Sequence, residues 1–531
     1  MSNPKLQATG LGAADETIRG GFGRITTSDV QSPSIKRRLL ALLAIMGPGI
    51  IVMVGDNDAG GITTYAQAGQ AYGTSLLWTL PLLVVVLAVS QEMVVRLGAV
   101  TGVGHGRLLK ERFGKFWAVF SVIDLFVLNF LTLVTEFIGV RYALGYIGIP
   151  PYASVFLMAA VLVASVISGR FERWERFMLV LVLVSLAVFP LMALSPFRWS
   201  SVAVGALFPS IKGGLTSTAV IFIIGIVGTT VAPWQLFFQQ SNIIDKRITP
   251  RWIRYERADT FIGSLLTNVA AAAVMVAAAF ALGGVTGQFQ DAGGLIRGFA
   301  HSLGSLGGYL FALVLLEASL IGAATVTLST SYALGDLFGV DQSLNRPVRD
   351  AKGFYGSYLI LVILAAGIVL IPRLPLSLIN LAVQVLAGVL LPSALAFLLL
   401  LCNDKEILGP WVNPPWLNVV ATFIIGLLLE LSLILTVVTV VPSVNVLSIL
   451  IVGLSLVALV TVGVWISQWR SRNSRPIVDK VARLSWSMPA SALLHRPRVN
   501  RGRSLVLGGL RIYLIVAIAL MIVSFVRLGG G

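Results

Sequence analysis

Charged residues are scarce in this sequence. Only 12% of the 531 residues are Asp, Glu, Lys or Arg, whereas 56% are hydrophobic, and the mean hydropathy is +0.90. A water-soluble domain needs a larger share of polar surface than this composition can supply. The composition therefore excludes a soluble globular protein and predicts an integral membrane protein.

Cysteine and recognisable catalytic motifs are also lacking. The single cysteine, Cys402, lies in an apolar run, which excludes a disulfide framework and a cysteine-cluster metal site. The apolar segments contain no HExxH or GxSxG motif and no Cys or His nucleophile apparatus. We therefore predict that the protein is not an enzyme and has no cofactor.

Long hydrophobic runs, by contrast, are abundant. A membrane-spanning helix needs about 20 apolar residues. Segments that meet this measure are 39–69, 74–98, 116–147, 152–168, 176–195, 215–243, 257–284, 308–338, 354–372, 375–402, 416–440, 446–468 and 508–527. We predict a ten-helix core at 39–402, helices 11 and 12 at 416–468, and an additional terminal helix at 508–527.

The basic residues predict the orientation of these helices. With the N-terminus inside, nearly all of the 39 Lys and Arg residues fall on the cytoplasmic face. The exceptions are Arg141, Arg198, Lys212, Arg297, Arg373 and Arg527. The distribution predicts a multi-pass protein of the plasma (inner) membrane with a cytoplasmic N-terminus. The net charge of +16 then faces anionic lipid rather than nucleic acid.

Two polar stretches flank the predicted spans. Residues 1–38 are rich in Gly, Ser and Thr without an apolar signal core, so we predict a disordered cytoplasmic arm. Residues 469–507 carry many Lys and Arg residues and are predicted to be a basic cytoplasmic linker.

Two of the predicted spans are interrupted. The first contains "GDNDAGGITT" (55–64), and the sixth contains "GIVGTTVAPWQLFFQQS" (225–241), where Pro233 cannot donate a backbone hydrogen bond. A lone Gly or Pro in a span can be a simple kink. Here the two breaks are five spans apart, as in inverted-repeat transporters whose half-helix ends form a midplane site. Asp56 and Asp58 add charge that costs about 2.5–3.5 kcal/mol each in a membrane centre, which favours a cation site.

The residues at these breaks resemble the Nramp family of divalent-metal transporters. That family has Asp-Pro-Gly-Asn after a "GPG" entry in helix 1 and Met-Pro-His in helix 6. In this chain "GPGIIVMVGDNDAGG" places Asp58 at the metal-binding aspartate and Gly61 at the asparagine. The string "TTVAPWQLFFQQ" places Thr229 at the carbonyl donor and Ala232 at the methionine.

Two more elements extend the resemblance over residues 40–467. "TEFIGV" (135–140) is similar to a third-helix element and contains Glu136, and "NLAVQVLAGVLLP" supplies Gln384 where the family has a metal-facing glutamine. The resemblance implies an all-α, LeuT-like inverted repeat of 5+5 helices, with helices 1 and 6 broken and additional C-terminal helices. It implies a metal site at Asp58, Gly61, Thr229, Ala232 and Gln384, and the charge in the first break adds Asp56 to these candidates.

The departures from the family pattern bear on which metal ion the site prefers. A methionine thioether favours transition metals, whereas carboxylate, amide and carbonyl oxygens suit hard ions such as Mg²⁺ and Mn²⁺. Ala232 offers no donor and Gly61 removes an amide oxygen, so the ion should keep more of its water, as Mg²⁺ prefers. This combination resembles the Nramp-related magnesium transporters. The alternative is that Ala232 is a neutral change in a Mn²⁺ or Fe²⁺ transporter.

The family resemblance also bears on proton coupling. Proton-driven members carry titratable residues where this chain has Leu133, Trp234 and Gln239. The three histidines, His105, His301 and His495, all fall in predicted loops, so the spans lack the usual neutral-pH proton relay. We therefore expect transport driven by the ion gradient and the membrane potential.

The predicted function is import of Mg²⁺ and Mn²⁺ by alternating access. Glu136 is either part of the ion path or a buried structural carboxyl group, and Thr230 and Gln235 are candidates to orient the ion's water. The alternatives are a proton-coupled Mn²⁺/Fe²⁺ transporter, an organic-solute carrier on the same fold, and a passive channel. The expected partners are the ions and membrane lipids, with no nucleic acid and no obligate protein partner.

Overall fold

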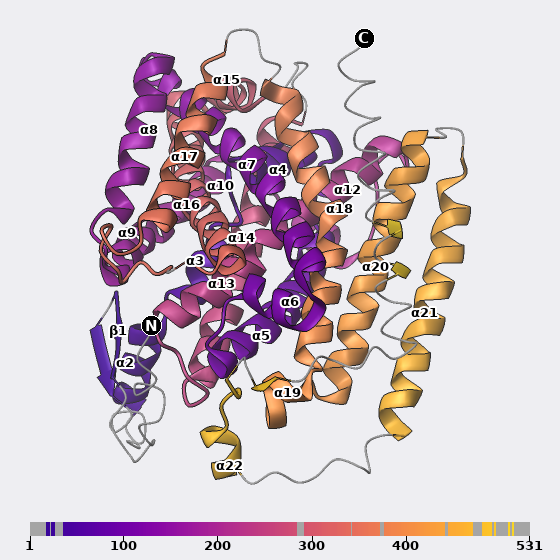
Figure 1. Cartoon of the computed structure of the whole chain (residues 1–531). Coiled ribbons are helices and arrows are strands. Elements are labelled where there is room, and N and C mark those ends of the chain that lie inside the picture. Colours follow the sequence, from indigo (N-terminus) through magenta and orange to yellow (C-terminus); the bar gives the residue numbers. More distant parts are fainter. Residues whose placement is uncertain are drawn as a thin grey trace.

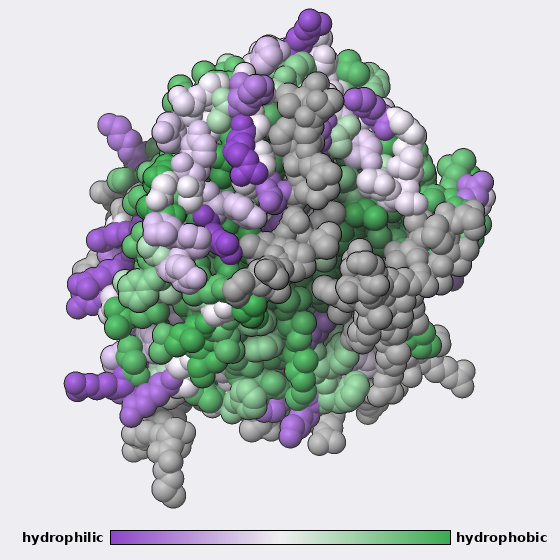
Figure 2. All heavy atoms as spheres, turned by 90° about the horizontal axis from the view of Figure 1, so that it is seen from above, coloured by the Kyte–Doolittle hydropathy of each residue, from purple (hydrophilic) through white to green (hydrophobic). Residues whose placement is uncertain are grey.

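The computed structural model describes residues 17–21, 23–26, 35–283, 291–340, 342–371, 376–440, 444–470, 480–490, 493–494, 508–509 and 512–513. These residues form a helical bundle with one small β-hairpin at its edge (Figure 1). Hydrophobic residues occupy broad areas of the surface in Figure 2. Large hydrophobic side chains along the helices, such as Phe156, Val452 and Leu459, are exposed, as expected where helices face lipid.

The first predicted span, 39–69, is divided into three helices. They are α2 (Ile35–Ile45), α3 (Pro48–Val54) and α4 (Ala59–Tyr72). α3 starts after Gly47, whose φ of 155° is in a region that L-residues avoid. The predicted break lies between α3 and α4.

The remaining elements follow in chain order. They are α5 (Thr79–Thr101), α6 (His105–Phe113), α7 (Lys115–Tyr146), α8 (Pro151–Val166), α9 (Phe171–Val184), the 3-10 turn η2 (Ser185–Ala187), α10 (Val188–Leu194), α11 (Trp199–Leu207), α12 (Ser217–Thr230), α13 (Pro233–Asp245), α14 (Ile253–Ala281), α15 (Ala292–Leu303), α16 (Ser305–Phe338), α17 (Lys352–Val369), α18 (Leu376–Cys402), α19 (Lys405–Leu408), η3 (Gly409–Trp411), α20 (Pro415–Val440), α21 (Val446–Arg470) and α22 (Lys480–Ser485).

The spans agree with the sequence prediction over most of the chain. In the part of the chain that the structure describes, 10 helical segments are long and apolar enough to cross a membrane, with α9–α10 and α12–α13 each counted once. The divided first segment and the shorter apolar helix α8 complete the first twelve predicted spans. The predicted thirteenth, 508–527, lies almost wholly outside the described residues.

The packing places the two broken helices at the centre of the bundle. α14 packs along both α3 and α4, α12 packs against α18, and α16 packs along α7. α20 and α21 pair with each other at one side, and α21 forms the outer edge in Figure 1. The ten-helix core therefore surrounds the breaks, while helices 11 and 12 are peripheral.

The predicted disorder of residues 1–38 is wrong for two described stretches, the start of α2 at Ile35 and a β-hairpin before it. Strands β1 (Thr17–Gly20) and β2 (Gly23–Thr26) form an antiparallel hairpin in which Ile18 pairs with Ile25. Both isoleucines are buried, and Gly21 N donates to Glu175 Oε2 at 2.6 Å. The hairpin was not predicted because the arm is polar overall and this pair of β-branched residues is isolated within it. Their burial against α2 stabilises the hairpin.

A buried charged cluster fixes the start of α3. Lys246 Nζ lies 2.6 Å from Glu175 Oε1, with both side chains fully buried. Asp259 accepts hydrogen bonds from Gly47 N and Gly49 N at 3.1 and 2.7 Å, and so caps the first half-helix. Because a helix N-terminus favours negative charge, this carboxylate holds α3 against α14.

Several segments predicted as loops are short helices. His105 begins α6 and His301 lies in α15, so neither histidine is in an irregular loop. His105 is buried, and its Nδ1 lies 2.8 Å from Gln240 Oε1. Burial lowers the pKa of His105 to about 4, and the hydrogen bond to Gln240 only partly offsets this effect. The imidazole is therefore neutral at neutral pH.

We expect His105 to make the protein less stable in acid. In the unfolded chain the imidazole binds a proton below about pH 6.5, but in the folded chain only below about pH 4. The folded state therefore has its full advantage above pH 6.5 and loses about 3 kcal/mol as the pH falls to 4. Thermal unfolding of the detergent-solubilised protein should show a smaller acid-induced drop in Tm for His105→Gln than for the wild type. Parallel pH profiles would refute this assignment.

Candidate functional site

The first break is closed by Asp58. Its backbone is extended (φ −68°, ψ 178°), and its side chain caps α4 through Oδ1, which accepts a hydrogen bond from Gly61 N at 2.6 Å. Asp is well suited to this N-cap position. The carboxylate is only 4% exposed and lies at the positive end of the α4 dipole. In the described part of the chain, no ion pair includes Asp58.

The second break lies between α12 and α13. α12 ends at Thr230 and α13 begins at Pro233, with Ala232 at the N-cap position. In a continuous helix the carbonyl of Thr229 would accept from the N–H of residue 233, which proline lacks. The carbonyl of Thr229 is thereby freed at the end of α12. Ala232 supplies no side-chain donor.

The two breaks and α18 meet at the N-terminus of α4. A β-carbon added to Gly61 would lie 2.5 Å from Thr229 Oγ1. A β-carbon added to Gly60 would overlap Gln384 Nε2. The sequence-predicted residues Asp58, Gly61, Thr229 and Gln384 are therefore brought together. Ala232 lies in the second break itself.

Glu136 reaches the same point from α7. Its Oε2 accepts from Ala59 N at 3.1 Å, and it is fully buried. A β-carbon on Gly322 of α16 would lie 2.9 Å from Asp58 Cβ and 3.0 Å from Glu136 Cδ. The side chains of Asp58 and Glu136 are thus neighbours, and both lie against the backbone of Gly322, where a larger residue would collide with them.

Asp56 lies inside the first break and is 1% exposed. Neither of its carboxylate oxygens has a hydrogen-bond partner among the described residues. Gln235 of α13 lies close to Asp56, and its Oε1 accepts from Gln91 Nε2 at 3.2 Å. Asp56 and Gln235 therefore form a second polar group beside Asp58.

Thr230 connects the two halves directly. Its hydroxyl lies 2.8 Å from the hydroxyl of Tyr65 on α4 and donates to Ile226 O at 2.6 Å. The role of Thr230 in orienting the ion's water stays a prediction, and the structure places its hydroxyl in a hydrogen bond between α4 and α12. Tyr65 was missed, although a phenol two turns after Asp58 on the same half-helix could have indicated it.

Unpaired polar atoms concentrate around this junction. Those that have no hydrogen-bond partner within the described chain are both Asp56 oxygens, Glu136 Oε1, Thr229 Oγ1, Gln235 Nε2 and Gln384 Nε2. Buried polar atoms are usually paired, so a cluster of this kind suits a polar guest that would supply the missing partners. The oxygens of the set suit a hard cation with some of its water.

The site differs from a fully protein-coordinated metal centre. Within the described ranges, no three His, Cys, Asp or Glu residues are grouped so that they could hold a metal ion. A small cavity of about 10 Å³, close to the volume one water needs, lies beside Ala59, Gly139 and Asn380. Asp291 and Tyr142 also line it, and sequence reasoning missed both. Asp291 caps α15, which lies at the end of the bundle opposite the hairpin (Figure 1).

Comparison with known families gives a match over most of the chain. The family model described as "Natural resistance-associated macrophage protein-like", Nramp, matches residues 49–438. This range contains both breaks, Glu136 and Gln384, and most of helix 11.

Individual relatives agree with that match. A protein named divalent metal cation transporter MntH 1, from Pseudomonas aeruginosa, is 28% identical over 75% of this chain and 92% of its own length. A divalent metal cation transporter MntH from Verminephrobacter eiseniae is 26% identical over 73% of this chain and 87% of its own. The crystal structure of a manganese transporter from Eremococcus coleocola has a TM-score of 0.65 at 20% identity, covering 87% of this chain and 99% of that one. The last likeness establishes the fold.

Proposed function

This chain belongs to the Nramp family, and from that premise we propose that it imports divalent metal cations, Mg²⁺ and also Mn²⁺, across the plasma membrane by alternating access. The observation that carries the proposal is the junction of the two broken helices. There the Asp58 carboxylate lies among oxygen and amide groups, and the second break offers Ala232 rather than a sulfur ligand. The relatives named above are divalent metal cation transporters, which supports the general class.

Chemistry favours a hard ion at this junction. Mg²⁺ prefers oxygen ligands, binds through one or two carboxylates and retains several waters. Asp58 can supply the carboxylate and the freed Thr229 carbonyl a neutral oxygen, and the unpaired Thr229 hydroxyl, which lies against Gly61, can contact the ion's water. The unpaired amide of Gln384 can donate to that water.

We propose further that the ion moves without a coupled proton. Trp234 and Gln239 replace the histidines that the family resemblance implies, and Gln239 Nε2 donates to Thr260 Oγ1 at 2.9 Å, so neither is a proton carrier. His105, the buried histidine of α6, is bonded to Gln240 and is neutral. The membrane potential alone supplies about 4.6 kcal/mol per 100 mV for a divalent cation.

One observation favours a second candidate, a proton-coupled Mn²⁺ or Fe²⁺ transporter of the same family. Glu136 is buried beside Asp58, and its Oε1 has no hydrogen-bond partner among the described residues. A carboxyl group in that position can exchange a proton when a cation reaches Asp58. Its accessibility to protons therefore distinguishes the two candidates.

Proteoliposome flux tests the proposal and separates the candidates. We expect purified protein to take up Mg²⁺ and Mn²⁺, with a rate that follows the membrane potential and is unchanged by a pH gradient. A pH dye inside the vesicles should show no acidification during uptake. Ca²⁺ serves as a divalent competitor and is expected to be excluded.

Two results of this experiment would contradict uncoupled transport or the transport proposal itself. Acidification that tracks Mn²⁺ uptake, and that disappears in Glu136→Gln while uptake continues, would establish the coupled candidate. Absence of uptake of any divalent ion by folded protein would overturn both.

A further inference from the structure

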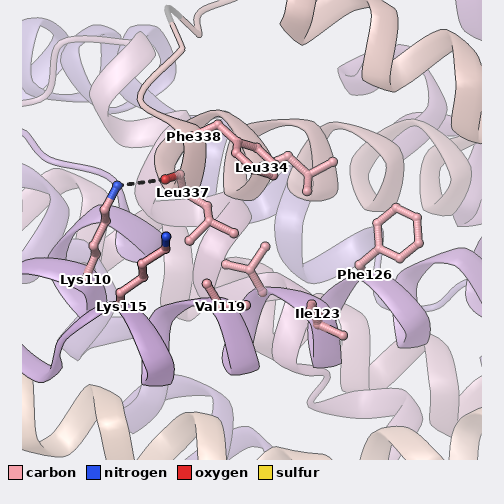
Figure 3. Close-up of a pocket in the computed structure, with 9 residues that line it drawn as sticks. Lys110, Lys115, Val119, Ile123, Phe126, Leu334, Leu337 and Phe338 are labelled. Carbon is pink, nitrogen blue, oxygen red and sulfur yellow. Dashed lines mark hydrogen bonds between the residues drawn. The ribbon is translucent and has the colours of Figure 1, made fainter.

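A mostly apolar groove with two lysines lies outside the ion junction. Figure 3 shows a groove of about 370 Å³ between the first turns of α7 and the last turns of α16, with α6 at one end. It is lined by Lys110, Lys115, Val119, Val122, Ile123, Phe126, Leu334, Leu337 and Phe338. The proposed transport mechanism uses none of these residues.

Apart from the two lysines, the lining is wholly apolar. Ile123 is 56% exposed and Phe338 is 72% exposed, so the groove opens on the outer surface of the bundle. In a membrane-spanning protein, such a surface faces acyl chains rather than water. The natural occupant of its apolar part is therefore hydrocarbon.

Both lysines lie at one end of the groove. Lys110 Nζ donates to Leu337 O at 2.9 Å, in the last turn of α16, where helix carbonyls lack intrahelical donors. The amino group of Lys115 lies near it, whereas Phe126 lies at the far end (Figure 3). Neither lysine forms an ion pair with a carboxylate of the described chain. The C-terminus of α16 offsets part of the Lys110 charge, and the rest of the positive charge at this end has no carboxylate partner in the described chain.

The dimensions match one leaflet of a bilayer. From Lys115 to Phe126 the helix α7 rises about 16 Å at 1.5 Å per residue. Half of a hydrocarbon core is about 15 Å. The lysine end belongs to the face predicted to be cytoplasmic, where anionic lipids concentrate. An acyl chain lying along α7 would thus place its headgroup at the lysines.

We propose that this groove binds an anionic phospholipid of the cytoplasmic leaflet. The phosphate accepts hydrogen bonds from Lys110 and Lys115, and an acyl chain packs against Val119, Ile123 and Phe126. A zwitterionic lipid fits the apolar wall equally well but brings its own cation to an end that is already positive. The groove therefore selects negative charge, and this selection does not depend on which ion the protein carries.

The test uses the full chain purified in mild detergent and exposed to equal amounts of phosphatidylglycerol and phosphatidylcholine with the same acyl chains. Native mass spectrometry then counts the lipid retained on each protein molecule. We expect the wild type to retain phosphatidylglycerol preferentially. In Lys110→Gln/Lys115→Gln, the retention of phosphatidylglycerol should fall roughly fivefold for each lysine removed. Lys352→Gln, an exposed lysine on the same face but outside the groove, is the matched control and should retain lipid like the wild type.

A second variant tests the apolar wall. Val119→Trp fills the groove without changing charge, so it should reduce retention of phosphatidylglycerol even if the double lysine variant fails to fold. Unchanged phosphatidylglycerol retention in either folded variant would overturn the proposal. Equal retention of both lipids by the wild type would also overturn it. A protein dimer that Val119→Trp dissociates, with lipid retention unchanged, would overturn it too, because the groove would then be an interface between two copies of the chain.

Discussion

Asp58→Asn is expected to reduce divalent-cation uptake at least about a hundredfold, because loss of even an outer-shell partner of a metal ligand costs roughly 10- to 100-fold. The substitution removes the negative charge at the junction of the two breaks but leaves an oxygen that can still accept from Gly61 N. Because Asn caps helices as well as Asp does, α4 should keep its start and the protein its fold. The loss therefore reports on charge rather than on structure.

The measurement is uptake of Mg²⁺ and Mn²⁺ into proteoliposomes, with Tm and ion binding recorded on the same preparation. Glu430→Gln is the matched control, because this buried carboxyl group lies in α20 and contacts α21 at Gly453 rather than the junction. We expect the control to transport like the wild type. Full uptake by a folded Asp58→Asn protein would remove this residue from the ion path.

The sequence was sufficient to locate both breaks because their causes are local. Pro233 lacks the N–H that a continuous helix needs, and Asp58 followed by paired glycines is a typical helix start. The structure places the breaks within one or two residues of these signals. Covalent chemistry and capping act over a few residues, so a single sequence records them directly.

The contacts between the breaks could not be predicted in the same way. That Gly60 packs against Gln384, or that Thr230 bonds to Tyr65, depends on how α4, α12 and α18 approach one another. No local signal specifies such an approach, and the expected role of Thr230 in hydration came from its position beside a break. The hairpin was missed for a related reason, because its stability comes from tertiary burial of Ile18 rather than from its composition.

Ala232→Met is expected to change which ion is preferred. A thioether in the second break would give a transition metal such as Cd²⁺ a soft ligand, while it would replace water that Mg²⁺ gives up reluctantly. A gain of about 1.4 kcal/mol for Cd²⁺ and a similar loss for Mg²⁺ would each be tenfold, so the ratio of the two affinities should change about a hundredfold. Methionine is flexible enough to adapt to irregular packing, and Ala232 is a buried N-cap residue that gives no side-chain hydrogen bond.

Ala232→Leu is the matched control, because leucine has nearly the volume of methionine but no sulfur. Binding of Mg²⁺, Mn²⁺ and Cd²⁺ to both variants by calorimetry, with uptake measured in parallel, separates ligand chemistry from bulk. If the leucine variant only weakens all three ions while the methionine variant raises Cd²⁺ affinity, then the missing donor at Ala232 sets the preference for hard ions. If the two variants behave alike, side-chain volume rather than sulfur controls this position, and the argument for Mg²⁺ from the residue at 232 fails.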